Sequence, residues 1–104
     1  MNATSVIDIS EAEMVSGLLN NDQECFSGIY DLHAAKLLGM IMKWVKEDTK
    51  AEMLLHNAFV KAWGDRKLFD PANGSIYYWL CRYARICYNE DVELGFCKQL
   101  QALQ

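Results

Sequence analysis

One stretch of the chain, Asp48 to Arg85, decides the fold: DTKAEMLLHNAFVKAWGDRKLFDPANGSIYYWLCRYAR. On both sides of its centre, apolar residues recur every three or four positions, which is the pattern of an amphipathic helix. The centre itself, residues 65–74, contains an Asp-Pro pair and an Asn-Gly pair, and both pairs form turns. The stretch therefore predicts a helix from residue 48 or 49 to Gly64, then a loop, then a helix that Ser75 caps.

Two more helices are expected before this stretch. The Ser10 hydroxyl can cap the first of them, and the Asp22 carboxylate can cap a second, longer one. Beyond Asn89 the sequence becomes acidic, and Gly95 interrupts the helical pattern. We therefore expect residues 90–104 to form either an acidic tail or a short fifth helix.

Length and composition predict a single all-α domain. The chain has 104 residues, 52% of them hydrophobic, and only one proline. Alternation of the strand type is missing from its long uninterrupted windows. We expect a compact bundle of four helices over residues 10–89, with residues 1–9 as an N-terminal extension and a fifth helix if residues 90–104 form one.

The charge of the chain is unevenly distributed. Between Lys61 and Arg85 there are five basic and two acidic residues, a local charge of +3 in a chain whose net charge is −4, so the remainder carries −7. The acidic total argues against a protein that coats duplex DNA by charge alone, because that mode neutralises many phosphates. A local basic segment with aromatic residues is instead typical of a surface for unpaired nucleic acid.

Other functional classes find little support in the sequence. Four cysteines without C-x-x-C spacing, and an N-terminus without signal-peptide features, predict a cytoplasmic protein with reduced thiols. No apolar run approaches the ~20 residues that span a bilayer, so no membrane partner is expected. Metal-ligand and catalytic motifs are also missing, so we expect no metal, no cofactor and no enzymatic activity. His33 follows the apolar stripe and is expected in the core or at its boundary.

Two adjacent tyrosines follow the loop. A helix cannot easily bury both Tyr77 and Tyr78 together with its apolar stripe, because neighbouring side chains point in different directions. At least one of them is therefore expected to be exposed. Stacking on a base or contact with a partner is one interpretation of that exposed ring, and an ordinary half-exposed tyrosine is the other.

The basic residues of the segment are Lys61, Arg66, Lys67, Arg82 and Arg85. The two arginines on the last helix are three positions apart and can form one cationic edge. Together with Lys61, Arg66 and Lys67, which are nearby in sequence, they predict contact with phosphates. A solvated polar face is the alternative interpretation.

Taken in order, the motifs of the chain resemble region 2 of the extracytoplasmic-function sigma factors of bacterial RNA polymerase. Asp22 to Phe26, followed by Tyr30, is similar to the family's D-E-E-A-F-x-x-L-Y. The segment from Ala51 to Trp63 is similar to A-E-D-L-V-Q-E-x-F-L-R-A-W, and 69–85 follows F-D-P-x-x-G-x-x-x-x-W-L-x-x-I-A-R-N. The resemblance covers about residues 10–90 and rests on the order and spacing of these pieces.

This resemblance implies a helical bundle with two tasks in transcription initiation. One task is binding the clamp helices of the polymerase β′ subunit, and the other is holding the unpaired non-template strand of the minus-ten promoter element. It implies a polymerase face at residues 53–57, a base-capturing loop at 66–74 and a strand-binding helix at 77–89. The implied polymerase-binding residues are Glu52, Met53, His56 and Asn57. The implied DNA-binding residues are Lys61, Arg66, Lys67, Asn73, Tyr77, Tyr78, Arg82, Arg85 and Asn89. An anti-sigma factor is a further implied partner.

The chain departs from the family at the polymerase face. The family reads D-L-V-Q-E there, whereas residues 53–57 read Met-Leu-Leu-His-Asn, so two carboxylates are missing. A hydrogen bond to a charged group is worth about 1.5–3 kcal/mol, so their loss weakens the expected contact. Glu52 remains and can stand in for part of it.

A second departure lies at the DNA end. The family's A-R-N becomes Ala-Arg-Ile at 84–86, and acidic residues, Glu90, Asp91 and Glu93, replace the basic ones that usually follow. Nothing in the 104 residues resembles the helix-turn-helix of region 4, which leaves open an excised piece or a protein that never had it.

Three hypotheses follow. The first is a sigma factor region 2 domain that joins polymerase to melted promoter DNA. The second is a degenerate sigma-like regulatory module that binds a protein, either an anti-sigma factor or polymerase, without promoter recognition. The third is a helical homodimer that buries a stripe of Phe96, Leu100 and Leu103.

Overall fold

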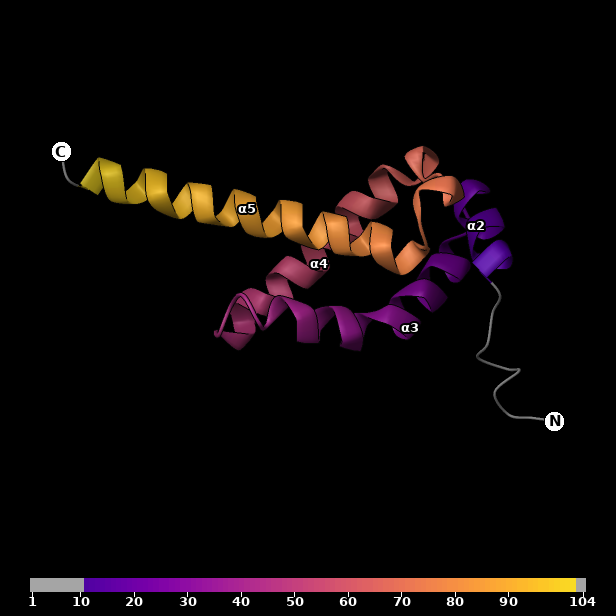
Figure 1. Cartoon of the computed structure of the whole chain (residues 1–104), viewed down its shortest axis with the longest axis horizontal. Helices are drawn as coiled ribbons and strands as arrows, with labels where there is room; N and C mark the ends of the chain where they lie inside the picture. The colour runs from indigo at the N-terminus through magenta and orange to yellow at the C-terminus, as the bar shows by residue number, and fades with distance from the viewer. Residues whose placement is uncertain (1–10, 103–104) are drawn as a thin grey trace.

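The computed structural model describes residues 11–102, with side chains up to Gly95. Its helices are α2 (Glu11–Leu19), α3 (Gln23–Ile41), α4 (Asp48–Gly64) and α5 (Ile76–Ala102), and two short 3-10 turns, η1 (Arg66–Leu68) and η2 (Pro71–Asn73), connect α4 to α5. Figure 1 shows α5 crossing α4, with α3 below them and α2 at one end of the bundle. The predicted all-α bundle of four helices is confirmed. Residues 1–9 and the predicted cap at Ser10 lie outside the described residues.

Two helix starts follow directly from polar side chains in the sequence. Asp22 Oδ1 accepts a hydrogen bond from the Cys25 amide at 3.1 Å, so it caps α3 as predicted. Ser75 Oγ accepts a hydrogen bond from the Tyr78 amide at 3.2 Å, which confirms the predicted cap of α5. Each such cap contributes about 1 kcal/mol to stability.

A single apolar core joins all four helices. Its fully buried large side chains come from α2, α3, α4 and α5, and they are Leu18, Ile29, Leu37, Ile41, Leu54, Ile76 and Leu80. Burial of one such side chain stabilises a fold by about 1.5–3 kcal/mol. The core therefore fixes how the first half of α5 lies against α3 and α4.

The last helix is longer than the sequence predicted. The expectation that it ends at Asn89, with Gly95 as an interruption, is wrong, because α5 continues without a break to Ala102. A glycine within a helix costs only about 1 kcal/mol, and two ion pairs, Lys50–Asp91 and Lys61–Glu90, attach this part of α5 to α4. Residues 90–102 are therefore neither a tail nor a separate fifth helix.

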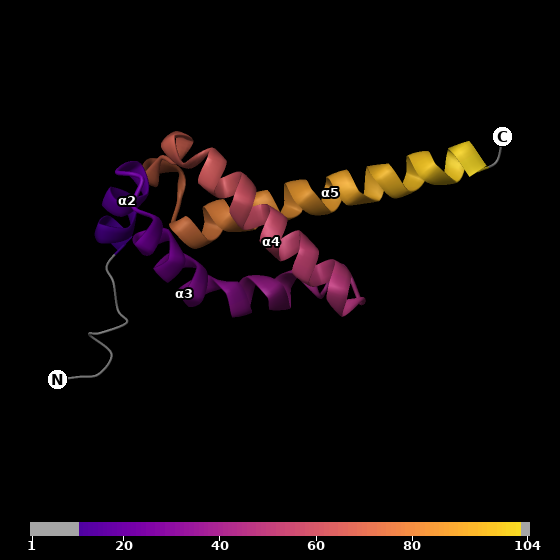
Figure 2. The ribbon, with the colours of Figure 1, turned by 180° about the vertical axis from the view of Figure 1, so that it is seen from behind.

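The C-terminal end of α5 extends beyond the other helices (Figure 1, Figure 2). The molecule accordingly measures 62 × 27 × 22 Å along its principal axes. The stripe of the homodimer hypothesis, at positions 96, 100 and 103, lies outside the described side chains.

Helix α2 closes the other end of the bundle. Glu11 Oε2 accepts a hydrogen bond from the Ile76 amide at 2.6 Å, so a carboxylate from the start of the described chain satisfies the first turn of α5. Within residues 11–102, none of the helices has the length and apolar character needed to cross a membrane.

Candidate functional site

The four residues predicted to bind polymerase lie on one exposed ridge of α4. Glu52, Met53, His56 and Asn57 are all exposed to solvent, and we call them the α4 ridge. Glu52 and His56 lie on the side of the ridge that faces α3, whereas Met53 and Asn57 lie on the side that faces α5. The ridge therefore separates two grooves.

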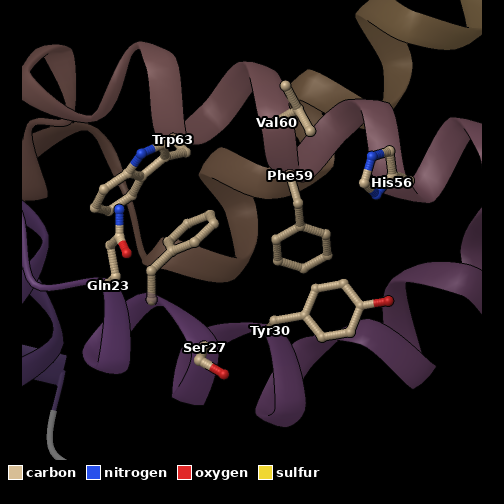
Figure 3. Close-up of a pocket in the computed structure, with 8 residues that line it drawn as sticks. Gln23, Ser27, Tyr30, His56, Phe59, Val60 and Trp63 are labelled. Atoms are coloured by element: carbon tan, nitrogen blue, oxygen red, sulfur yellow. The ribbon is translucent and has the colours of Figure 1, made fainter.

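The groove between α3 and α4 is the more aromatic of the two. It encloses about 410 Å³, and its lining residues are Gln23, Phe26, Ser27, Tyr30, His56, Phe59, Val60 and Trp63. Figure 3 shows Tyr30 and Phe59 pointing into the space between the two helices, with their ring centroids 4.6 Å apart. Tyr30 is 39% exposed because it forms part of the groove wall.

The groove between α4 and α5 encloses about 420 Å³. Met53 and Asn57 of the α4 ridge line it together with Lys61. The Lys61 ammonium lies 3.5 Å from the Glu90 carboxylate, so part of its charge is already neutralised by α5. Since this ion pair is largely exposed, it contributes ~0–1 kcal/mol to stability.

The predicted DNA-binding residues Asn73, Tyr78 and Arg82 lie together. They line a small hollow of about 40 Å³ between η2 and the first turns of α5. Tyr78 is 56% exposed and Tyr77 is half-buried, which confirms that at least one of the two tyrosines is exposed. We call Asn73, Tyr78 and Arg82, with the exposed Lys67 on η1, the loop surface.

The backbone of the loop is fixed by two local features. Asp70 Oδ1 accepts a hydrogen bond from the Ala72 amide at 2.9 Å, which closes the turn η2 around Pro71. Gly74 then has a φ of +132°, and a Cβ at this position would lie 2.9 Å from Tyr78 Cδ2. Only glycine combines that φ with so close an approach to the ring.

Arg66 is a predicted DNA-binding cation whose donors form hydrogen bonds within the fold. Its Nε donates to Asn21 Oδ1 and its Nη1 donates to the Trp63 carbonyl, both at 2.8 Å. The guanidinium carbon also lies 4.1 Å from the centroid of the Trp63 ring. Arg66 therefore attaches η1 to α4 and to the turn before α3, and it is a positioning residue in this conformation.

The remaining predicted residues lie along α5. Arg85 and Asn89 are exposed, and they follow Arg82 of the loop surface by about one and two helical turns. The Arg85 guanidinium lies 4.9 Å from the centroid of the Trp44 ring and 5.5 Å from that of Tyr88. Sequence reasoning did not single out Trp44 or Tyr88 as functional, because Trp44 and Arg85 are 41 positions apart and only the fold brings them together.

Two further groups near α5 have shifted pKa values. The Tyr83 hydroxyl donates to Asp65 Oδ2 at 2.8 Å, and burial together with this bond raises the pKa of Tyr83 to about 12. His33 is half-buried, as predicted, 5.7 Å from the Tyr77 ring, and burial lowers its pKa. Its Nε2 is buried without a hydrogen-bond partner among the described atoms.

Comparison with known proteins finds relatives that share one name. The chain is 25% identical over 79 residues to the ECF RNA polymerase sigma factor SigK of Mycobacterium tuberculosis, and to the protein of the same name from Mycobacterium bovis. The aligned part is 76% of this chain and 41% of the relatives, so the chain spans about two fifths of the length of the curated proteins it matches. No family model and no solved structure matches. The similarity supports a distant relation to the sigma factors of RNA polymerase.

Proposed function

We propose that this chain is a sigma factor region 2-like domain that acts in transcription initiation in the cytoplasm. The observation that carries the proposal is the agreement between the ordered motifs and the similarity to SigK, which extends over 76% of the chain. In the proposed role, the α4 ridge docks on the clamp helices of the polymerase β′ subunit, and the loop surface holds the unpaired non-template strand of the minus-ten element.

The arrangement of the two surfaces supports these two tasks. The α4 ridge lies in the first half of α4, whereas the loop surface begins after its last residue, Gly64. Asn57, the ridge residue nearest the loop, and Gly64 are seven residues apart on one helix, which corresponds to about 10 Å along the axis. A protein partner on the ridge therefore leaves the loop open to a strand.

The chemistry of the loop surface suits an unpaired strand. Tyr78 presents an exposed ring on which a base can stack, and Arg82 beside it can pair with a phosphate. The Asn73 side chain offers a donor and an acceptor to a base edge. In the present conformation the hollow between them is about 40 Å³, so a base would stack over it rather than enter it.

Binding to a β′ clamp-helix fragment and to a single-stranded minus-ten oligonucleotide tests the proposal. We expect both partners to bind, and Glu52→Lys to weaken only the fragment because it reverses the carboxylate left on the ridge. Arg82→Gln is the matched variant and is expected to weaken only the oligonucleotide. Lack of detectable affinity for either partner would refute the proposed function.

The aromatic groove between α3 and α4 favours a second candidate, a sigma-like module that regulates by binding a protein. Val60 and Tyr30 expose apolar surface there, and the groove continues past Tyr30 toward Glu52. A groove of this kind accepts an amphipathic helix, such as one of an anti-sigma factor or of polymerase.

Restoring the family's charges separates the two candidates. The double variant Met53→Asp with Asn57→Glu supplies the two missing carboxylates. If it creates binding to the clamp fragment where the natural chain has none, the protein is the regulatory form. If the natural chain already binds, the first candidate stands.

A further inference from the structure

A cluster of rings and one cation lies where the middle of α5 packs against the end of α3. The Trp44 and Tyr88 rings have centroids 5.3 Å apart and planes inclined by 39°. The Arg85 guanidinium lies within 4.9 Å of the Trp44 centroid and 5.5 Å of the Tyr88 centroid. We call these three residues the ring cluster. Arg85 is nine residues beyond Ile76, the first residue of α5, so the cluster is about 14 Å along the axis from the start of that helix.

A second pair of the same kind lies on the same side of α5. The Lys36 ammonium of α3 is 4.5 Å from the centroid of the Tyr77 ring. Lys36 is exposed and Tyr77 is half-buried. The seam between α3 and α5 therefore carries a cation on a ring near the loop surface and a second one further along the helix.

The cations of this seam differ from the lysines of α4 in what neutralises them. Within the described part of the chain, the ion pairs join Lys50 to Asp91 and Lys61 to Glu90, on the side of α5 that faces α4. Arg85 instead contacts aromatic rings, which attract a cation without cancelling its charge. Its charge is therefore available to an anion from outside the molecule.

The geometry also suits a flat ligand. Bases stack on both arginine planes and aromatic rings. Arg85 is exposed, and the Trp44 and Tyr88 rings are only half-buried, so a base can reach them. Because the three side chains already hold one another in place, binding costs less ordering of rotamers than at an isolated surface arginine.

We propose that the ring cluster is a second stacking site for an unpaired nucleic acid strand, beyond the loop surface. The strand would run from Tyr78 along the seam, past Lys36 and Tyr77, to Arg85 and Trp44. This proposal rests on the proposed function, since it extends the path of the same strand. It assigns a binding role to Trp44, Tyr88 and Lys36.

Strand binding by variants of the full chain tests this site. The probe is a fluorescein-labelled single-stranded DNA of about 12 nucleotides, a length within the range that one small domain covers. Trp44→Leu and Arg85→Gln are each expected to weaken binding about five-fold or more, because one stacking contact contributes that much. Lys50→Gln removes one positive charge on the other side of α5 and is expected to change binding less than about two-fold. A duplex of the same sequence should bind more weakly, since its bases are not free to stack.

Tryptophan fluorescence adds a readout that a purely structural role of Trp44 does not change. The strand is expected to quench the emission of the natural chain, and the quenching should shrink in Trp44→Phe, which keeps a ring at the position and preserves the packing. Thermal unfolding shows which variants remain folded. If Trp44→Leu is unfolded, Trp44→Phe takes its place in the binding comparison.

Two results would overturn this proposal, and they have different consequences for the proposed function. If Arg82→Gln weakens strand binding while the folded ring-cluster variants bind like the natural chain with unchanged quenching, the ring cluster is only a structural clamp and the proposed function stands. If the natural chain binds no strand even at low salt, both proposals fall.

Discussion

The cations along the two sides of α5 have different interaction partners. Toward α4, the ammonium groups of Lys50 and Lys61 lie 3.2 Å and 3.5 Å from carboxylates of α5. Toward α3, Arg85 and Lys36 lie over aromatic rings. A carboxylate partner cancels a charge, whereas a ring leaves the charge in place and adds a surface for stacking. The side that faces α3 is therefore the better surface for a strand, although a count of charges along the sequence does not distinguish the two sides.

The largest expected effect comes from removing core packing that holds α5 against both α3 and α4. Leu80 is fully buried in α5, so Leu80→Ala should lower the free energy of unfolding by about 2–5 kcal/mol. Leu94→Ala, on the same helix at a position 61% exposed, should change it by less than about 0.5 kcal/mol. Urea denaturation measures both variants. Equal effects would mean that α5 is not docked as described.

A smaller effect is expected from the loop, which adjoins the side of α5 proposed for the strand. Gly74→Ala forces a side chain into a φ of +132° and against the Tyr78 ring, so it should destabilise the protein by about 1–3 kcal/mol and weaken strand binding. Gly39→Ala is the matched control, because open space surrounds that helical position, and it should stabilise the protein by about 0.5–1 kcal/mol. Tolerance of alanine at position 74 would contradict the described loop conformation.

The hydrogen bond between Tyr83 and Asp65 predicts a dependence on pH. The pKa of Tyr83 is raised to about 12 in the fold, while an unfolded tyrosine has a pKa of about 10. The unfolded state therefore loses this proton first, so the stabilisation is complete below pH 10 and is lost as the pH rises from about 10 to 12.

Tyr83→Phe removes the hydrogen bond and should cost about 1 kcal/mol at neutral pH. The difference in unfolding free energy between the natural chain and this variant should shrink above pH 10. A difference that stays constant to pH 12 would show that the tyrosine is not held by Asp65.

The smallest expected effect comes from the ion pair between Lys61 and Glu90, on the side of α5 that faces α4. Glu90→Gln removes the carboxylate beside Lys61, and the exposed ion pair should contribute only ~0.2–1 kcal/mol in a double-mutant cycle with Lys61→Gln. Release of the Lys61 charge should raise strand affinity about two-fold at low salt, and the gain should vanish at high salt. A fall in strand affinity would show that Glu90 has another role.

The sequence was sufficient for most of the fold because the decisive signals are local. The cap at Asp22, the helix from Asp48 to Gly64 and the cap at Ser75 each depend on neighbouring residues, and the structure contains all three. The continuation of α5 through Gly95 was not predictable in this way. It depends in part on ion pairs between α4 and α5 that only the tertiary structure creates.

The candidate site was less accessible to sequence reasoning. Local spacing placed Asn73, Tyr78 and Arg82 near the loop, and the structure brings them to one hollow. It gave no sign that Arg66 would bond to Asn21, 45 positions earlier, or that Arg85 would lie on Trp44. Which cations are engaged within the fold is decided by contacts distant in sequence, and periodicity carries no information about those contacts.

The salt dependence of strand binding by the natural chain tests the central claim most directly, namely that the loop surface and the α3 side of α5 hold an unpaired strand. Four cations on these surfaces, Lys36, Lys67, Arg82 and Arg85, predict a slope of log affinity against log salt of about −2 to −3 for single-stranded DNA, with weaker binding of the matching duplex. A slope near zero, or a preference for the duplex, would contradict the account.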